Sequence, residues 1–171
     1  DDTAERAGRL SLNPMVHLDL MGLAMVVFLG FGYAKPVPTN PYKFSRPSAD
    51  LWISAAGPMM NLVLAVVTWN VFLALWTAGV EFVHTPAVVL FVELLVFVNL
   101  LLMTFNLIPI APLDGHYILP YVLPPSTRSR ITYLNQRFGP LLLLSLIGLS
   151  IMGIPILDRL LSFAHSMVPW I

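Results

Sequence analysis

The stretch FNLIPIAPLDG, residues 105–115, ends a long apolar run with two prolines and an acid. Pro109 and Pro112 each remove a backbone N–H donor, and each disfavours helical dihedral angles in the residue before it. Lipid cannot satisfy the carbonyl groups that a broken helix releases, so such backbone exists at membrane depth only inside protein or beside a water-filled cavity. The stretch therefore predicts a polar pocket within a helical bundle, with Asp114 pointing into it. The alternative is that this segment has left the membrane and forms an ordinary interfacial loop.

The composition is that of a membrane protein. Apolar residues make up 57% of the 171 residues and charged residues 11%, whereas an average soluble domain is about 25% charged. The nine basic and nine acidic residues balance, and the sequence contains no basic patch that would indicate a nucleic-acid partner. The high apolar content makes a lipid bilayer the expected environment. The absence of cysteine excludes disulfides and thiol catalysis.

The apolar residues fall into about four segments, which predict an all-α membrane protein, a polytopic helical bundle forming a single transmembrane domain over residues 1–171. The segments are 16–31, 51–78, 87–108 and 140–157. Between the first two, closely spaced prolines forbid a helix and predict a short extended or β-like surface loop near 33–45. A proline-broken segment follows near 108–115, and the amphipathic tail 158–171 is expected at the membrane interface.

The distribution of Lys and Arg predicts an orientation. The loops 32–50 and 109–139 contain three Lys or Arg residues each, and the loop 79–86 contains none. Cytoplasmic loops carry the excess of basic residues. Because two predicted spans separate the basic loops, both are expected in the cytoplasm.

Asn61 ends the sequence AAGPMMN, residues 55–61, in the second apolar segment. An amide both donates and accepts hydrogen bonds, so Asn61 is able to hold a carbonyl oxygen or the Asp114 side chain. On the residues alone, the simpler interpretation is a polar contact between packed helices.

The remaining polar residues of the apolar segments form no complete catalytic pattern. Asn99 and Asn106 lie seven residues apart, on one helix face, and are expected to face the bundle. His17 and Asp19 are either metal ligands or a polar helix start, and His116 is a candidate ligand through its proximity to the acid at 114. No HExxH sequence occurs, and no two histidines are four residues apart.

Four stretches in this order closely resemble the site-2 protease family of intramembrane zinc metalloproteases, in its compact prokaryotic form. The stretches are NPMVHLDLMG, FGYAKPVPTNPYKF, SAAGPMMNLVLA and FNLIPIAPLDGHYIL. The resemblance covers residues 1–123. Each stretch alone is a weak signal, whereas four in the right order and spacing are a strong one.

The resemblance implies a mechanism and a location. In this family an HExxH helix supplies two zinc-binding histidines and a glutamate base, and the aspartate of a Leu-Asp-Gly motif completes the zinc site. That aspartate matches Asp114. The asparagine of an Ala-Gly-Pro-x-x-Asn motif, thought to steady the substrate or oxyanion, matches Asn61. The implied substrate is a transmembrane segment of another membrane protein, and the implied location is the prokaryotic inner membrane.

The chain departs from the family pattern in three places. Leu20 stands where the family usually has proline, and Tyr33 where it usually has tryptophan. The larger departure is the missing HExxH, because the opening DDTAERAGRL resembles the stretch that follows that helix. We therefore expect this chain to be the C-terminal part of a protease core whose HExxH helix lies upstream, and expect it to be inactive alone.

Two other interpretations remain open. An aspartyl-type intramembrane protease would use two acids, Asp19 and Asp114, whose pKa values would split because like charges share one site. A non-catalytic membrane scaffold or transporter-like subunit would use broken helices to line a solute path. The oligomeric state is not predicted by any of these patterns.

Overall fold

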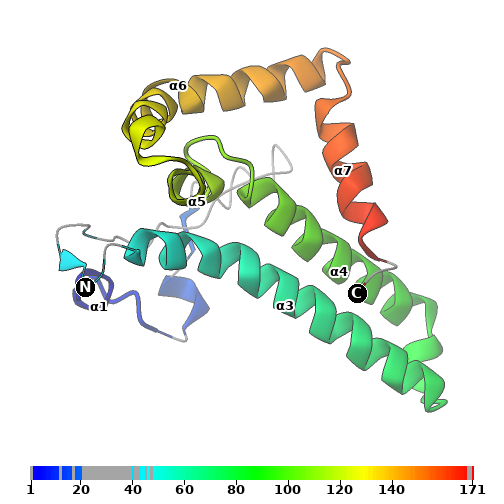
Figure 1. Ribbon diagram of the computed structural model, residues 1–171. Helices are drawn as coiled ribbons and strands as arrows, with labels where there is room; N and C mark the ends of the chain where they lie inside the picture. Colours follow the sequence, from blue (N-terminus) through cyan, green and yellow to red (C-terminus); the bar gives the residue numbers. More distant parts are fainter. Residues whose placement is uncertain are drawn as a thin grey trace. The chain divides into compact units, whose positions relative to one another are not determined.

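The computed structural model describes residues 2–11, 13–16, 18–20, 40, 43–44, 46, 48–168 and 171. The chain divides into two compact units, Asp1–Ala49 and Asp50–Ile171. All regular structure in the described residues is helical, and no strand occurs among them (Figure 1). Three helices are long and apolar enough to cross a membrane: α3 (Ala49–Thr77), α4 (Pro86–Asn106) and α6 (Pro125–Ile151). The prediction of an all-α membrane protein is confirmed.

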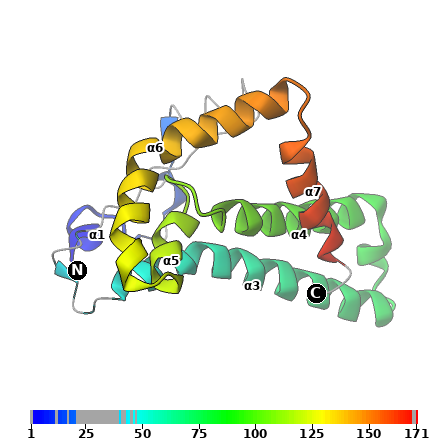
Figure 2. The ribbon, with the colours of Figure 1, turned by 45° about the horizontal axis from the view of Figure 1, so that its top comes forward.

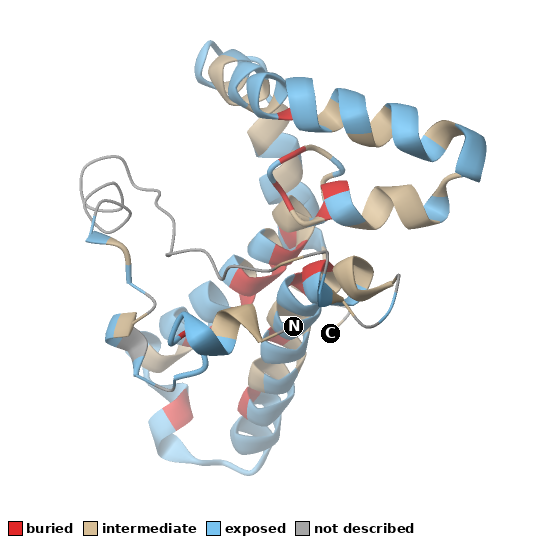
Figure 3. Cartoon of the chain, turned by 90° about the vertical axis from the view of Figure 1, so that its left-hand side faces the viewer, coloured by how far each residue is buried: buried red, intermediate tan, exposed pale blue. Residues whose placement is uncertain are grey.

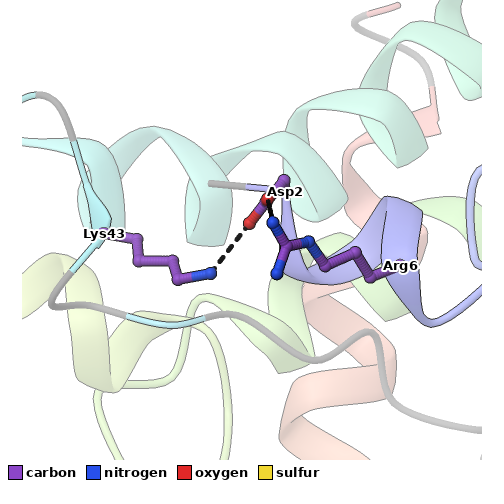
Figure 4. A network of polar contacts seen from close by, with 3 residues as sticks. All are labelled: Asp2, Arg6 and Lys43. Atoms are coloured by element: carbon purple, nitrogen blue, oxygen red, sulfur yellow. Dashed lines mark hydrogen bonds and ion pairs between the residues drawn. The ribbon is translucent and has the colours of Figure 1, made fainter.

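The first unit contains two short helices, α1 (Thr3–Arg6) and η1 (Pro14–Val16). The Asp2 carboxylate forms two ion pairs (Figure 4). Its Oδ2 lies 2.6 Å from Nη2 of Arg6, and its Oδ1 lies 2.9 Å from Nζ of Lys43. The hydrogen bond from Lys43 lowers the pKa of the Asp2 carboxyl. All three side chains are substantially exposed, so this network contributes little stability. Most of the first predicted apolar segment, 16–31, and of the predicted β-like loop near 33–45 lies outside the described residues.

α3 and α4 form a helical hairpin joined by η3 (Glu81–His84) (Figures 1 and 2). α3 continues without interruption through Pro58, although the proline ring removes one intrahelical donor. Pro86 lies in the first turn of α4, where a missing N–H costs nothing. The facing sides of these helices form the core, which is built from Ala65, Phe72, Val83, Val92, Val96, Leu100 and Ala164.

Ala164 belongs to α7 (Ile156–Ser166), which packs against α4. Within the tail, which is expected to lie at the membrane interface, α7 contributes Ala164 to the helical core. The position of the tail relative to a membrane stays a prediction. Figure 3 shows few buried residues among many exposed ones on the helices. The exposed residues include many large apolar ones in α3, α4 and α6. Apolar outer surfaces of this kind suit contact with lipid tails.

The fourth predicted segment differs from the observed helix. α6 begins at Pro125, and residues 125–139, which were expected to be a surface loop, form its first half. The first half of α6 was not predicted because its sequence is polar. A helix that faces water or a protein neighbour needs no continuous apolar run. α6 ends at a turn in which Gly153 has φ 98°, a conformation that favours glycine. The predicted segment to residue 157 is therefore divided between α6 and α7.

Candidate active site

The proline-containing link between α4 and α5 (Gly115–Val122) is tightly folded. The N–H of Ile110 donates to the carbonyl of Ile108 at 2.8 Å, and the N–H of Leu113 donates to the carbonyl of Ile110 at 2.9 Å. Ala111 and Leu113 are buried. The link is therefore partly packed into the protein, whereas Leu107, Pro109 and Pro112 are exposed.

Asn135 of α6 satisfies the backbone of this link at two points. Its Oδ1 accepts a hydrogen bond from the N–H of Ala111 at 2.9 Å, and its Nδ2 donates to the carbonyl of Pro109 at 2.7 Å. An unsatisfied backbone group away from water is costly, and this one amide side chain satisfies two of them. Sequence reasoning missed Asn135, because nothing distinguishes it from the other polar residues that precede the apolar half of α6.

The start of α5 lies close to the end of α4. A methyl group added to Gly115 would lie 2.6 Å from the carbonyl oxygen of Ile108 and would also collide with the carbonyl of Leu107. Only glycine fits here without backbone movement. This close approach fixes the position of Asp114, the residue that directly precedes α5.

Asp114 is half-buried and faces α3. A methyl group added to Gly57 would lie 3.2 Å from Oδ2 of Asp114. Among the described residues, no side chain or backbone group forms a hydrogen bond or ion pair with this carboxylate. Asp114 lies outside the three candidate spans, and burial raises the pKa of its carboxyl. A partly buried carboxylate without a partner is available to a cation.

Asn61 lies four residues after Gly57, one helical turn away on the same face of α3. Its side chain is half-buried. The residues that precede it on this face, Ser54 and Pro58, are buried. Asn61 thus lies on the side of α3 that faces Asp114, while the role of each residue stays a prediction.

Of the other candidate metal ligands, only His116 lies in the same unit as Asp114 and is described. His116 is buried against Tyr117, with ring centroids 4.6 Å apart, and its Nδ1 has no hydrogen-bond partner in the part of the chain that the structure describes. Burial lowers the pKa of this imidazole, which favours the neutral ring. Asp19 belongs to the first unit, and His17 lies outside the described residues.

Asn99 faces the bundle, as expected, since its side chain is 7% exposed. Its amide donates to the carbonyl of Leu95 on its own helix, at 2.8 Å, and the contact is not made across helices. Asn106, at the end of α4, is half-buried.

The described residues fit one position of a zinc site and do not complete it. No group of three metal-ligating side chains occurs in this part of the chain, whereas a catalytic zinc needs three protein ligands and one open position. Asp114 supplies a carboxylate of the right chemical type. The other donors would have to come from outside the described residues.

The chain was compared with families, curated proteins and solved structures. No family model matches the chain, and no solved structure matches it. The chain is 38% identical over 135 residues to a Bacillus subtilis (strain 168) protein named "Putative zinc metalloprotease YwhC". The match covers 77% of this chain and 62% of that protein. The chain therefore spans somewhat less than two thirds of the relative that it matches.

Proposed function

We propose that this chain forms most of an intramembrane zinc metalloendopeptidase of the site-2 type, with Asp114 as a zinc ligand. Its reaction would be hydrolysis of a peptide bond within or near a transmembrane segment of a membrane-protein substrate. The observation that carries the proposal is the position of Asp114. This residue is half-buried, has no partner among the described residues, and lies against Gly57 of a helix that is able to span a membrane. The name of the 38% identical relative supports the metal and the reaction class.

The remaining ligands are proposed to be the two histidines of an HExxH helix that is not in these 171 residues. A bound zinc would lower the pKa of its water toward neutrality and polarise the scissile carbonyl. The glutamate of that helix would act as the base, and this chain's own residues would position the third ligand and the substrate. The packed link would hold the Asp114 carboxylate in place, and the Asn61 amide, one turn from Gly57, would donate to the substrate carbonyl oxygen where negative charge develops. Without the HExxH helix, the chain is expected to be inactive.

Asp114→Asn in the complete gene product tests this function. Asparagine keeps the shape of the side chain but removes its charge, so zinc content and cleavage of a membrane-anchored reporter should both be lost. Asp158→Asn is the matched control, because Asp158 is an exposed acid in the first turn of α7. Unchanged zinc content and cleavage in the Asp114 variant would reject the proposal.

One observation favours a second candidate, a membrane scaffold or transporter-like subunit without catalysis. The described residues hold no group of three metal-ligating side chains. A complete gene product that contains no HExxH and retains no zinc would support this candidate. Cleavage that survives a chelator would instead support an aspartyl-type protease.

A further inference from the structure

We infer that Asn135 is the positioning residue that holds the Asp114 carboxylate in place, an inference that rests on the proposed function. The two residues lie on different elements and are linked through the backbone of residues 109–113. Asn135 contacts the first half of that link, and Asp114 follows its end. The helix α6 would thereby fix where the charge of Asp114 lies relative to α3.

The two hydrogen bonds of Asn135 join its side-chain amide to two backbone groups of the link. The Pro109 carbonyl and the Ala111 N–H flank Ile110, and Asn135 bonds both, at 2.7 and 2.9 Å, as a peptide group of a neighbouring strand would. Neither group has another hydrogen-bond partner within the link. Removing the Asn135 amide therefore takes the partner from the part-buried N–H of Ala111 and from the more exposed carbonyl of Pro109 at the same time.

A steric contact strengthens this link to α6. Gly139 lies one helical turn after Asn135, and a methyl group added there would lie 2.7 Å from Asn135 Oδ1 and 2.8 Å from the backbone nitrogen of Ala111. At Gly139 the backbone of α6 therefore lies directly against Ala111, with no space there for a larger side chain. Two adjacent turns on one face of α6 contact Ala111.

Short contacts also restrain the backbone between Ala111 and Asp114. The buried residues Ala111 and Leu113 enclose the turn closed by the hydrogen bond from Leu113 to Ile110. The carbonyls at the end of α4 confine Gly115 on the other side of the acid. Asp114 thus lies between two confined neighbours, and release of Ala111 would free the carboxylate to move away from Gly57.

Asn135→Ala in the complete gene product, purified in detergent, tests the inference with three measurements. The Zn²⁺ affinity should fall about 10- to 100-fold, the usual effect of losing a group that orients a metal ligand. Amide hydrogen exchange should accelerate in the peptide that contains Ala111 and stay unchanged in α3. The value of kcat should fall while KM for the reporter changes little, because Asn135 would not touch the substrate.

Gln136→Ala is the matched control, because Gln136 is an exposed amide residue adjacent on the same helix. Asn135→Asp is the milder variant, since it keeps the acceptor for the Ala111 N–H and loses the donor to Pro109. Its Zn²⁺ affinity should lie between those of the parent and Asn135→Ala. If Asn135→Ala does not fold, the Asp variant alone decides the question.

The outcomes separate the inference from the function. If Asp114→Asn loses Zn²⁺ while both Asn135 variants bind it within twofold of Gln136→Ala, the inference is overturned and the function stands. A loss of folding stability with unchanged Zn²⁺ affinity and kcat would likewise show a merely structural role. If Asp114→Asn binds Zn²⁺ and cleaves like the parent, the function fails, and the inference, which rests on it, fails too. Accelerated exchange at Ala111 in Asn135→Ala would then report only the structure of the link.

Discussion

Gly57 on α3 leaves the space that the carboxylate of Asp114 occupies, since a methyl group at residue 57 would lie 3.2 Å from Oδ2. This contact is closer than ordinary van der Waals packing, so the carboxylate would have to move by a few tenths of an ångström to admit even alanine. The two residues are far apart in the sequence and come from separate helical regions. Their contact explains why a glycine precedes Pro58 within a helix, where glycine is otherwise unfavourable.

Gly57→Ala should stabilise the protein and weaken the proposed zinc site. Replacing glycine in a helix interior gains roughly 0.5–1 kcal/mol, while the added methyl displaces the carboxylate. We expect a higher unfolding temperature together with weaker Zn²⁺ binding, and a further loss of binding with Gly57→Val. Thermal unfolding and Zn²⁺ titration of the complete gene product measure the two effects separately.

Gly148→Ala is the control for this prediction. Gly148 lies in α6, and a methyl group there would meet nothing within 4 Å. This variant should gain helix stability without any change in Zn²⁺ affinity. Equal Zn²⁺ affinities for the two alanine variants would show that the Gly57 contact does not control the position of Asp114.

Gly115→Ala should destabilise the protein. The added methyl would meet the backbone carbonyls of Leu107 and Ile108, and backbone atoms cannot move aside as a side chain end can. Overpacking of this kind costs about 1–3 kcal/mol. Chemical unfolding monitored by circular dichroism should show this loss, whereas stability equal to or above that of the parent would contradict the close approach of α4 and α5.

Asn61→Ala should lower kcat and leave zinc binding intact. If its amide donates to the carbonyl oxygen in the transition state, its removal should lower kcat by about 100- to 1,000-fold. Asn70→Ala is the matched control, because Asn70 lies further along α3 and bonds the carbonyls of Val66 and Ile171. If kcat of the Asn61 variant equals that of the parent, Asn61 has no role in the reaction and only packs between helices.

The fold class and the break in the helix before Asp114 were predictable from the sequence, because both rest on local chemistry, whereas the site itself stays a prediction. Long apolar runs require helices in lipid, and the prolines at 109 and 112 required a break after α4. The position of Asp114 followed from its place directly after that break. The structure places Asn61 on the side of α3 that faces Asp114.

The contacts that hold the candidate site in place were not predictable, because they join residues that are distant in the sequence. Asn135 has no local feature that distinguishes it from Gln136, and only the folded chain brings it to Pro109 and Ala111. The start of α6 was misjudged because Pro140 resembled a helix start, although Pro125 occupies that position. Similarly, the amphipathic pattern of α7 suits a membrane surface and a packed helix equally well.

Ala164→Leu should distinguish a packed α7 from one at the membrane surface. Ala164 is fully buried in the core where α7 packs against α4, so a larger side chain would overfill the contact and cost about 1–3 kcal/mol. Ser162→Leu is the control, because residue 162 on the same helix is exposed and leucine there should have little effect. Unfolding in detergent measures both variants. Equal stabilities for the two would mean that α7 does not pack against α4, because a helix lying on a membrane surface accepts leucine at either position.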